Sequence, residues 1–261
     1  MQVIVLAFVL VSSSRLMTFE ESGPFPAFFT FAMLSLLLSC VYNAIYNTLS
    51  PDVRLPFAVD EIAECAALLL LSAGFEILLG KSKKIHVLPL LFSVMFMGAN
   101  IALWIAWSGE WGQDIVFGLP YIYFMYLLLR GLHDTKALRL TEMLFIAFFA
   151  SGILYAMTAE LSAPEEYALT IDLSCLIVSV IIEALLFVKY FAAMREPEGG
   201  KKALFLSLAI VFWTILVTYM NEDILYNVAL LINTISLPFT LLAVKKCCPS
   251  KGWERNERKM I

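Results

Sequence analysis

Charged side chains are scarce in this sequence, and their scarcity excludes an ordinary soluble globular protein. Asp, Glu, Lys and Arg make up 15% of the 261 residues, whereas soluble domains carry about 25%. Hydrophobic residues make up 61%, and they occur in long blocks separated by short polar connections. No polar stretch reaches the roughly 50 residues that a separate soluble domain needs. This composition is typical of a protein that crosses a membrane many times.

The sequence also lacks the common signatures of enzymes. It has only two histidines, His86 and His133, so a catalytic zinc site with three histidine ligands is excluded. The HExxH, GxSxG, P-loop and dinucleotide-binding motifs are absent. No basic patch with interleaved aromatic residues indicates a nucleic-acid partner. We therefore expect no cofactor, no bound metal and no nucleic acid, and we favour a protein that is not an enzyme.

The cysteines do not form a disulfide framework. Three of the five lie within apolar segments and the other two are adjacent, so we expect reduced thiols. There is no Asn-x-Ser/Thr glycosylation site, which favours a bacterial source. The cysteines are Cys40, Cys65, Cys175, Cys247 and Cys248.

The apolar blocks predict an all-α polytopic membrane protein. Eight of them approach or exceed the length of about 20 residues that spans a bilayer, and a shorter N-terminal block, residues 1–17, is expected to be a ninth helix or else to lie along the membrane surface. Because the connections are short, consecutive helices should pack antiparallel. We expect one bundle domain, residues 1–246, and a short basic tail, residues 247–261, suited to anionic lipid headgroups. The eight predicted spans are 25–49, 56–80, 86–107, 113–130, 138–158, 166–190, 202–220 and 223–244.

The distribution of charge predicts the topology. Almost all Lys and Arg residues fall in alternate connections and in the C-terminal tail, whereas the other connections are acidic, with Glu110 and Glu160 as examples. The positive-inside rule then places the basic connections and the C-terminus in the cytoplasm. We expect the chain to be a multi-pass protein of the cell membrane. Trp104 and Trp107 end one span at the opposite side, as expected for an aromatic belt at the membrane interface.

Acidic residues inside the span 166–190 are the strongest functional signal. Asp172 and Glu183 are eleven residues apart, which at about 100° per residue brings them within roughly 20° of one helix face, and Ser179 lies on that face too. Such a stripe should face protein or water rather than lipid, and it predicts binding of a ligand or a proton. The alternative is that Glu183 extends toward Lys189 while Asp172 bonds to a neighbouring helix.

Two further polar residues are candidates for the same cavity. Glu64 would lie about 12 Å into its span at 1.5 Å per residue, and it could instead complement the positive end of the helix dipole. Asn43 follows Ser39 at i, i+4 spacing, a pattern that more often indicates helix packing than a binding site.

These residues predict a multi-pass membrane protein that binds or moves a small ligand through a carboxylate-lined cavity, as a carrier or a sensor. Its partners would be the lipid bilayer and a small-molecule ligand, together with a membrane or cytoplasmic protein if it acts as a sensor. The alternatives are an intramembrane enzyme that acts on lipid, with carboxylates and a metal, or a non-catalytic assembly subunit of a membrane complex.

Overall fold

The computed structural model describes residues 1–17, 23–49, 59–80, 86–162, 164–219 and 224–248. Within these residues every regular element is an α-helix, and eight of the helices are long and apolar enough to cross a membrane. The prediction of an all-α polytopic membrane protein is therefore confirmed. The helices are α1 (Gln2–Ser14), α2 (Phe25–Leu49), α3 (Val59–Leu79), α4 (Val87–Ser108), α5 (Trp111–Asp134), α6 (Leu140–Glu160), α7 (Glu165–Arg195), α8 (Gly200–Thr218) and α9 (Ile224–Cys247).

The helix ends follow local backbone chemistry. Gly80 and Gly109 come directly after α3 and α4 in the left-handed conformation, at φ 69° and 73°, where glycine has no Cβ to clash. Each donates its N–H back to the preceding turn, to the carbonyls of Glu76 and Ile105. α7 continues to Arg195, beyond the predicted end at 190, so its 31 residues exceed the length that the hydrocarbon core requires.

Some of the predicted boundaries lie outside the described residues. These are the first residues of the span predicted at 56–80, the junction between the last two spans, and the tail from residue 249 onward. All five cysteines lie within the described residues and are free thiols, as the sequence predicted.

The N-terminal helix α1 belongs to the bundle. Its 13 residues are short for a span, but it packs against α2 and α9 and buries Leu6 and Val9. The side chain of Gln2 donates a 3.2 Å hydrogen bond to Asn233 in α9. One side of α1 is therefore covered by α2 and α9, while Ile4, Phe8 and Val11 on its other side are exposed, and the crossing of the membrane by α1 stays a prediction.

Helix α8 forms the centre of the bundle. It is apolar around its whole circumference and nearly all of its side chains are buried, which is the pattern of a helix enclosed by others. It packs against α5, α7 and α9. A Cβ at Gly200 would lie 2.8 Å from the backbone of Lys246 and Cys247, so the start of α8 touches the end of α9 directly.

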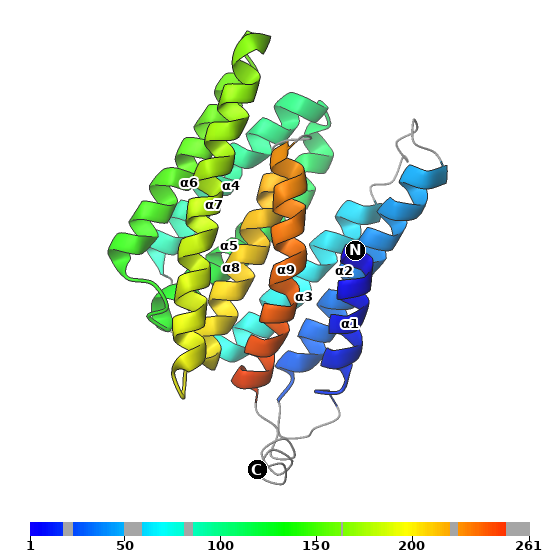
Figure 1. Cartoon of the computed structure of the whole chain (residues 1–261), viewed down its shortest axis with the longest axis vertical. Coiled ribbons are helices and arrows are strands. Elements are labelled where there is room, and N and C mark those ends of the chain that lie inside the picture. The colour runs from blue at the N-terminus through cyan, green and yellow to red at the C-terminus, as the bar shows by residue number, and fades with distance from the viewer. Residues whose placement is uncertain (18–22, 50–58, 81–85, 163, 220–223, 249–261) are drawn as a thin grey trace.

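Figure 1 shows how the helices are arranged in the bundle. α8 and α9 lie between a group formed by α1, α2 and α3 and a group that includes α6 and α7. Consecutive helices pack side by side in α2–α3, α4–α5, α6–α7 and α8–α9.

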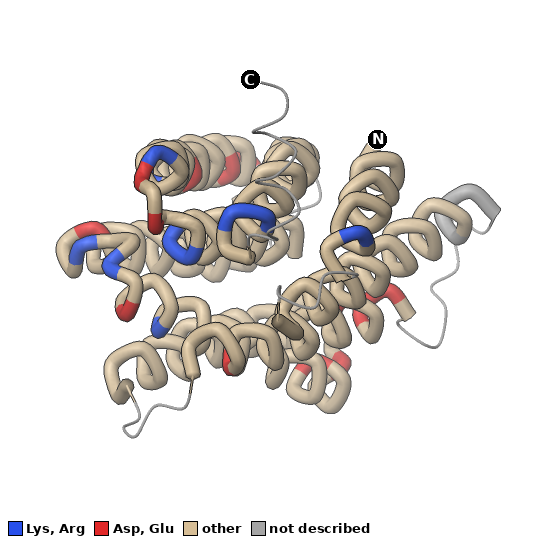
Figure 2. Tube along the Cα trace, turned by 90° about the horizontal axis from the view of Figure 1, so that it is seen from below, with Lys and Arg blue, Asp and Glu red and all other residues tan. Residues whose placement is uncertain are grey.

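We call the end where α7 and α9 finish the basic end, because Lys and Arg gather at the helix ends there (Figure 2). We call the opposite end, where α3 begins and α4 finishes, the acidic end. The assignment of the basic end to the cytoplasm stays a prediction.

Candidate functional site

The predicted site residues lie in three separate places. Asp172 lines one cavity, Glu64 and Asn43 line another, and Glu183 and Ser179 lie outside both. The cavity that Asp172 lines does not include Glu183, so the expectation that the two carboxylates share one cavity gains no support and stays a prediction. They do lie on one face of α7, but eleven residues correspond to about 16 Å along a helix, and different neighbours cover the two positions.

Asp172 lies near the acidic end, where α7 meets the start of α9. It is half-buried and lines a cavity of about 400 Å³. Asn227 of α9 is the other polar residue in the lining, and Leu and Ile side chains make up the rest. The role of Asp172 in binding stays a prediction.

Glu183 is held in a short hydrogen-bonded chain inside the bundle. Its side chain is 3% exposed, and its Oε1 accepts a 3.3 Å hydrogen bond from the hydroxyl of Ser179. The indole N–H of Trp213 in α8 donates to the same hydroxyl at 2.9 Å. Glu183 does not extend toward Lys189, which instead forms an ion pair with Glu142 of α6.

Glu64 and Asn43 line a cavity of about 180 Å³ near the acidic end, which we call the acidic cavity. Helices α1, α2, α3, α8 and α9 all contribute to it. Three of its lining residues are carboxylates from the first turns of α3, and none of the described lining residues is Lys, Arg or His. The polar lining consists of Gln2, Ser39, Asn43, Asp60, Glu61, Glu64, Thr218, Tyr219, Tyr226 and Asn233.

The walls of the acidic cavity are positioned by hydrogen bonds between distant helices. The phenol of Tyr219, just after α8, donates a 2.6 Å hydrogen bond to Oε2 of Glu64. On the other wall, Asn233 donates through Nδ2 to the hydroxyl of Thr214 at 2.8 Å, and its Oδ1 accepts from Gln2. Because these partners come from four helices, the polar groups are held in place by the packing of the bundle.

A second cavity of about 150 Å³ borders the acidic cavity, and we call it the aromatic cavity. Glu61 and Tyr219 line both. The rings of Trp104, Tyr121 and Tyr219 form one cluster, with centroids 5.5 Å apart for Trp104–Tyr121 and 5.7 Å apart for Trp104–Tyr219. The remaining lining residues are Cys65, Trp107, Ser108, Asp114 and Phe117. Ring faces beside carboxylates attract cations.

Two carboxylates of the aromatic cavity are oriented by local partners. Gln113 donates a 3.1 Å hydrogen bond to Glu61, and Ser108 donates a 2.5 Å hydrogen bond to Asp114. The first contact joins the start of α3 to the first turn of α5, and the second joins the end of α4 to the same turn of α5. Glu61 and Asp114 thus each accept a hydrogen bond from a neutral polar side chain.

Sequence reasoning missed the aromatic part of this site. Trp104 and Trp107 were attributed to an interfacial belt, and the structure places both in the lining of the aromatic cavity. Tyr219 and Tyr121 gave no signal, because a single tyrosine in an apolar helix is common and its partner lies far away in the sequence.

A further cavity of about 470 Å³ lies nearer the basic end between α4, α5, α6, α7 and α8. Its lining is apolar apart from His86, His133 and the indole of Trp213. None of the predicted site residues lines it. We call it the apolar cavity.

No protein-family model, curated protein or solved structure matches this chain. The membrane architecture follows from the eight apolar helices, and the case for a function is made from the geometry of the cavities.

Proposed function

We propose that this multi-pass membrane protein binds a small cation in the acidic cavity, as a carrier or a sensor. The observation that carries the proposal is that Asp60, Glu61 and Glu64 line one cavity from one end of α3, with no basic residue in the described lining. Three carboxylates in so small a space repel one another, and each also loses hydration. A bound cation or proton offsets both costs, whereas an anion would add to them.

The other lining groups support the same ligand. Asn43 and Ser39 supply amide and hydroxyl oxygens that can accept from an ammonium group or coordinate a metal cation. Asn233 is already held by hydrogen bonds to Thr214 and Gln2, so that wall is organised before a ligand arrives. A ligand binds to preorganised polar groups at a smaller entropic cost than to groups that must first be ordered.

The neighbouring aromatic cavity favours an organic cation over a bare metal ion. Trp, Tyr and Phe side chains surround a space that borders two carboxylates, Glu61 and Asp114. Aromatic rings attract alkylated ammonium groups through their faces, at about 0.5–2 kcal/mol per contact. We infer that the cation of the acidic cavity is a small alkylammonium ion, which binds where Glu61 and Tyr219 line both cavities and has its alkyl groups toward the aromatic cavity.

Binding and uptake of radiolabelled tetramethylammonium, with Na⁺ as competitor, test the proposal in the purified full chain. Glu64→Gln should lower binding at least about tenfold by removing one charge from the cavity. Glu198→Gln is the matched control, because Glu198 is exposed in the connection between α7 and α8. Uptake into proteoliposomes identifies a carrier, and binding without uptake identifies a sensor. A wild-type chain that binds neither ion, or a Glu64→Gln variant that binds as wild type does, would overturn the proposal.

A further inference from the structure

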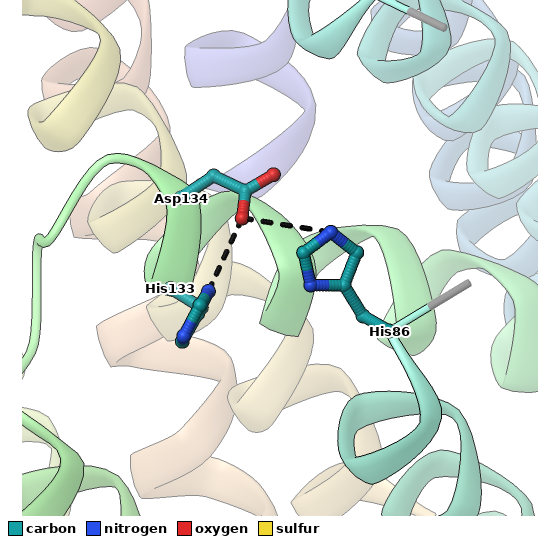
Figure 3. Close-up of side chains that lie close together, drawn as sticks. All are labelled: His86, His133 and Asp134. Atoms are coloured by element: carbon teal, nitrogen blue, oxygen red, sulfur yellow. Dashed lines mark hydrogen bonds and ion pairs between the residues drawn. The ribbon is translucent and has the colours of Figure 1, made fainter. Parts of the chain in front are cut away.

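The only two histidines of the chain meet an aspartate at the basic end (Figure 3). His86 is the residue directly before α4, while His133 and Asp134 form the last turn of α5. One ligand atom from each of the three side chains lies within 4.8 Å of the others. Oδ1 of Asp134 is 3.1 Å from Nδ1 of His133 and 3.8 Å from Nε2 of His86.

The carboxylate of Asp134 is held by a buried arginine. Arg130 is 4% exposed, and it donates through Nη2 to the carbonyl of Gly80 at 2.9 Å. Its Nε lies 3.4 Å from Oδ2 of Asp134. One carboxylate oxygen is therefore turned toward the arginine and the other toward the two imidazoles. Partners of this kind orient the ligands of a metal site and raise its affinity.

We propose that His86, His133 and Asp134 bind a divalent transition-metal ion of the Zn²⁺ class. Two imidazole nitrogens and one carboxylate oxygen suit such ions, whereas Mg²⁺ and Ca²⁺ prefer oxygen ligands alone. Ligand atoms about 2.0–2.1 Å from a tetrahedral ion lie roughly 3.3–3.5 Å from one another. The observed 3.1 Å and 3.8 Å separations are close to that spacing. His133 is 59% exposed and has room to adjust.

Two features of the surroundings favour this position. The negative end of the α5 dipole lies at His133 and Asp134, and it stabilises a cation. Both histidines also line the apolar cavity, so the ion would lie beside that cavity. Three protein ligands leave one coordination position open for water or another small ligand. This is the metal–cavity combination that the alternative of an intramembrane enzyme requires.

The sequence alone argued against a metal because it counted histidines only. A third ligand from a carboxylate satisfies the same chemistry, and Asp134 becomes a candidate only once α4 and α5 are packed together. The site lies at the opposite end of the bundle from the acidic cavity. Metal binding at this site can therefore be tested independently of the proposed cation binding in the acidic cavity.

Titration of the purified full chain with Co²⁺ and Zn²⁺ tests the site. The affinity tag must contain no histidine, so that His86 and His133 are the only imidazoles present. We expect one ion per chain, a Co²⁺ visible spectrum without a thiolate charge-transfer band, and displacement of Co²⁺ by Zn²⁺. His133→Ala, His86→Asn and Asp134→Asn should each weaken binding by more than about 100-fold, beyond the loss typical of an outer partner.

Matched variants separate this site from other ligands. The Cys247→Ser/Cys248→Ser double variant should bind the ion as wild type does, because its thiols are not part of the site. Arg130→Lys should weaken binding by about 10- to 100-fold while leaving one ion per chain. His133→Ala changes an exposed side chain and should keep the helical circular-dichroism spectrum of the wild type. No binding by the wild-type chain, or unchanged binding by folded His133→Ala, would overturn the proposal.

Discussion

The phenol of Tyr219 donates a 2.6 Å hydrogen bond to the carboxylate of Glu64, although 155 positions separate the two residues in the sequence. The bond joins the end of α8 to the early turns of α3. It also stands at the boundary between the acidic and aromatic cavities, because Tyr219 lines both. The proposed cation site therefore depends on the docking of α8 against α3.

Tyr219→Phe should lower the stability of the bundle. The change keeps the ring but removes the donor to Glu64, and a hydrogen bond to a charged group contributes about 1.5–3 kcal/mol. A thermal unfolding scan in detergent should show a lower midpoint. Tyr155→Phe is the matched control, because the Tyr155 side chain is exposed on α6 and its loss should leave the midpoint unchanged. Equal midpoints for both variants would contradict a structural role for the bond.

Glu183→Gln should leave tetramethylammonium binding unchanged and should not reduce stability. Glu183 is buried with Ser179 as its hydrogen-bond partner, and a neutral amide of the same shape removes the cost of burying a charge. Binding assays and unfolding midpoints on the same preparation check both statements. Lost binding would instead support the sequence-based prediction that Glu183 contributes to the ligand site.

Ser179→Ala should lower the stability of the bundle, because it removes the middle member of the same hydrogen-bonded chain. It leaves both the indole N–H of Trp213 and the carboxylate of Glu183 without their shared partner. Each unsatisfied buried group costs about 1–3 kcal/mol, so the unfolding midpoint should fall. A midpoint equal to that of the wild type would show that the chain from Trp213 to Glu183 contributes nothing to the packing of α7 against α8.

Trp104→Leu should reduce the affinity for tetramethylammonium while leaving Na⁺ affinity nearly unchanged. The indole contributes a ring face to the aromatic cavity, and a lost cation–π contact of about 0.5–2 kcal/mol corresponds to roughly 2- to 30-fold. Trp111→Leu is the control, since Trp111 is exposed at the start of α5 and does not line that cavity. Equal losses for the two ions would argue against an organic-cation site.

Gly200→Ala should destabilise the bundle, whereas Gly152→Ala should not. A methyl group at Gly200 would meet the backbone of Lys246 and Cys247 at 2.8 Å, so α8 and α9 would have to separate at a cost of about 1–3 kcal/mol. A methyl group at Gly152 in α6 meets nothing within 4 Å and gains helix propensity. Opposite shifts of the unfolding midpoint are expected. A fall for both variants would show that glycine serves another purpose in these helices.

The candidate site was predictable only in part. Glu64 and Asn43 were singled out as polar residues inside apolar spans, and both line the acidic cavity. Asp172 and Glu183 were joined by the periodicity of α7, which correctly places them on one face of that helix. What lies opposite that face changes along its length, from the α9 residue Asn227 to the α8 residue Trp213. The sequence of α7 alone does not show which helix packs against each part of its polar face.

The sequence by itself determined the number, order and approximate limits of the membrane helices. A bilayer core demands about 20 apolar residues whose backbone groups bond within their own segment, so each span is encoded locally. The tertiary structure alone decided which polar groups meet. Tyr219 reaches Glu64, and His86 reaches Asp134, only because the packing of whole helices brings together residues that no local pattern connects.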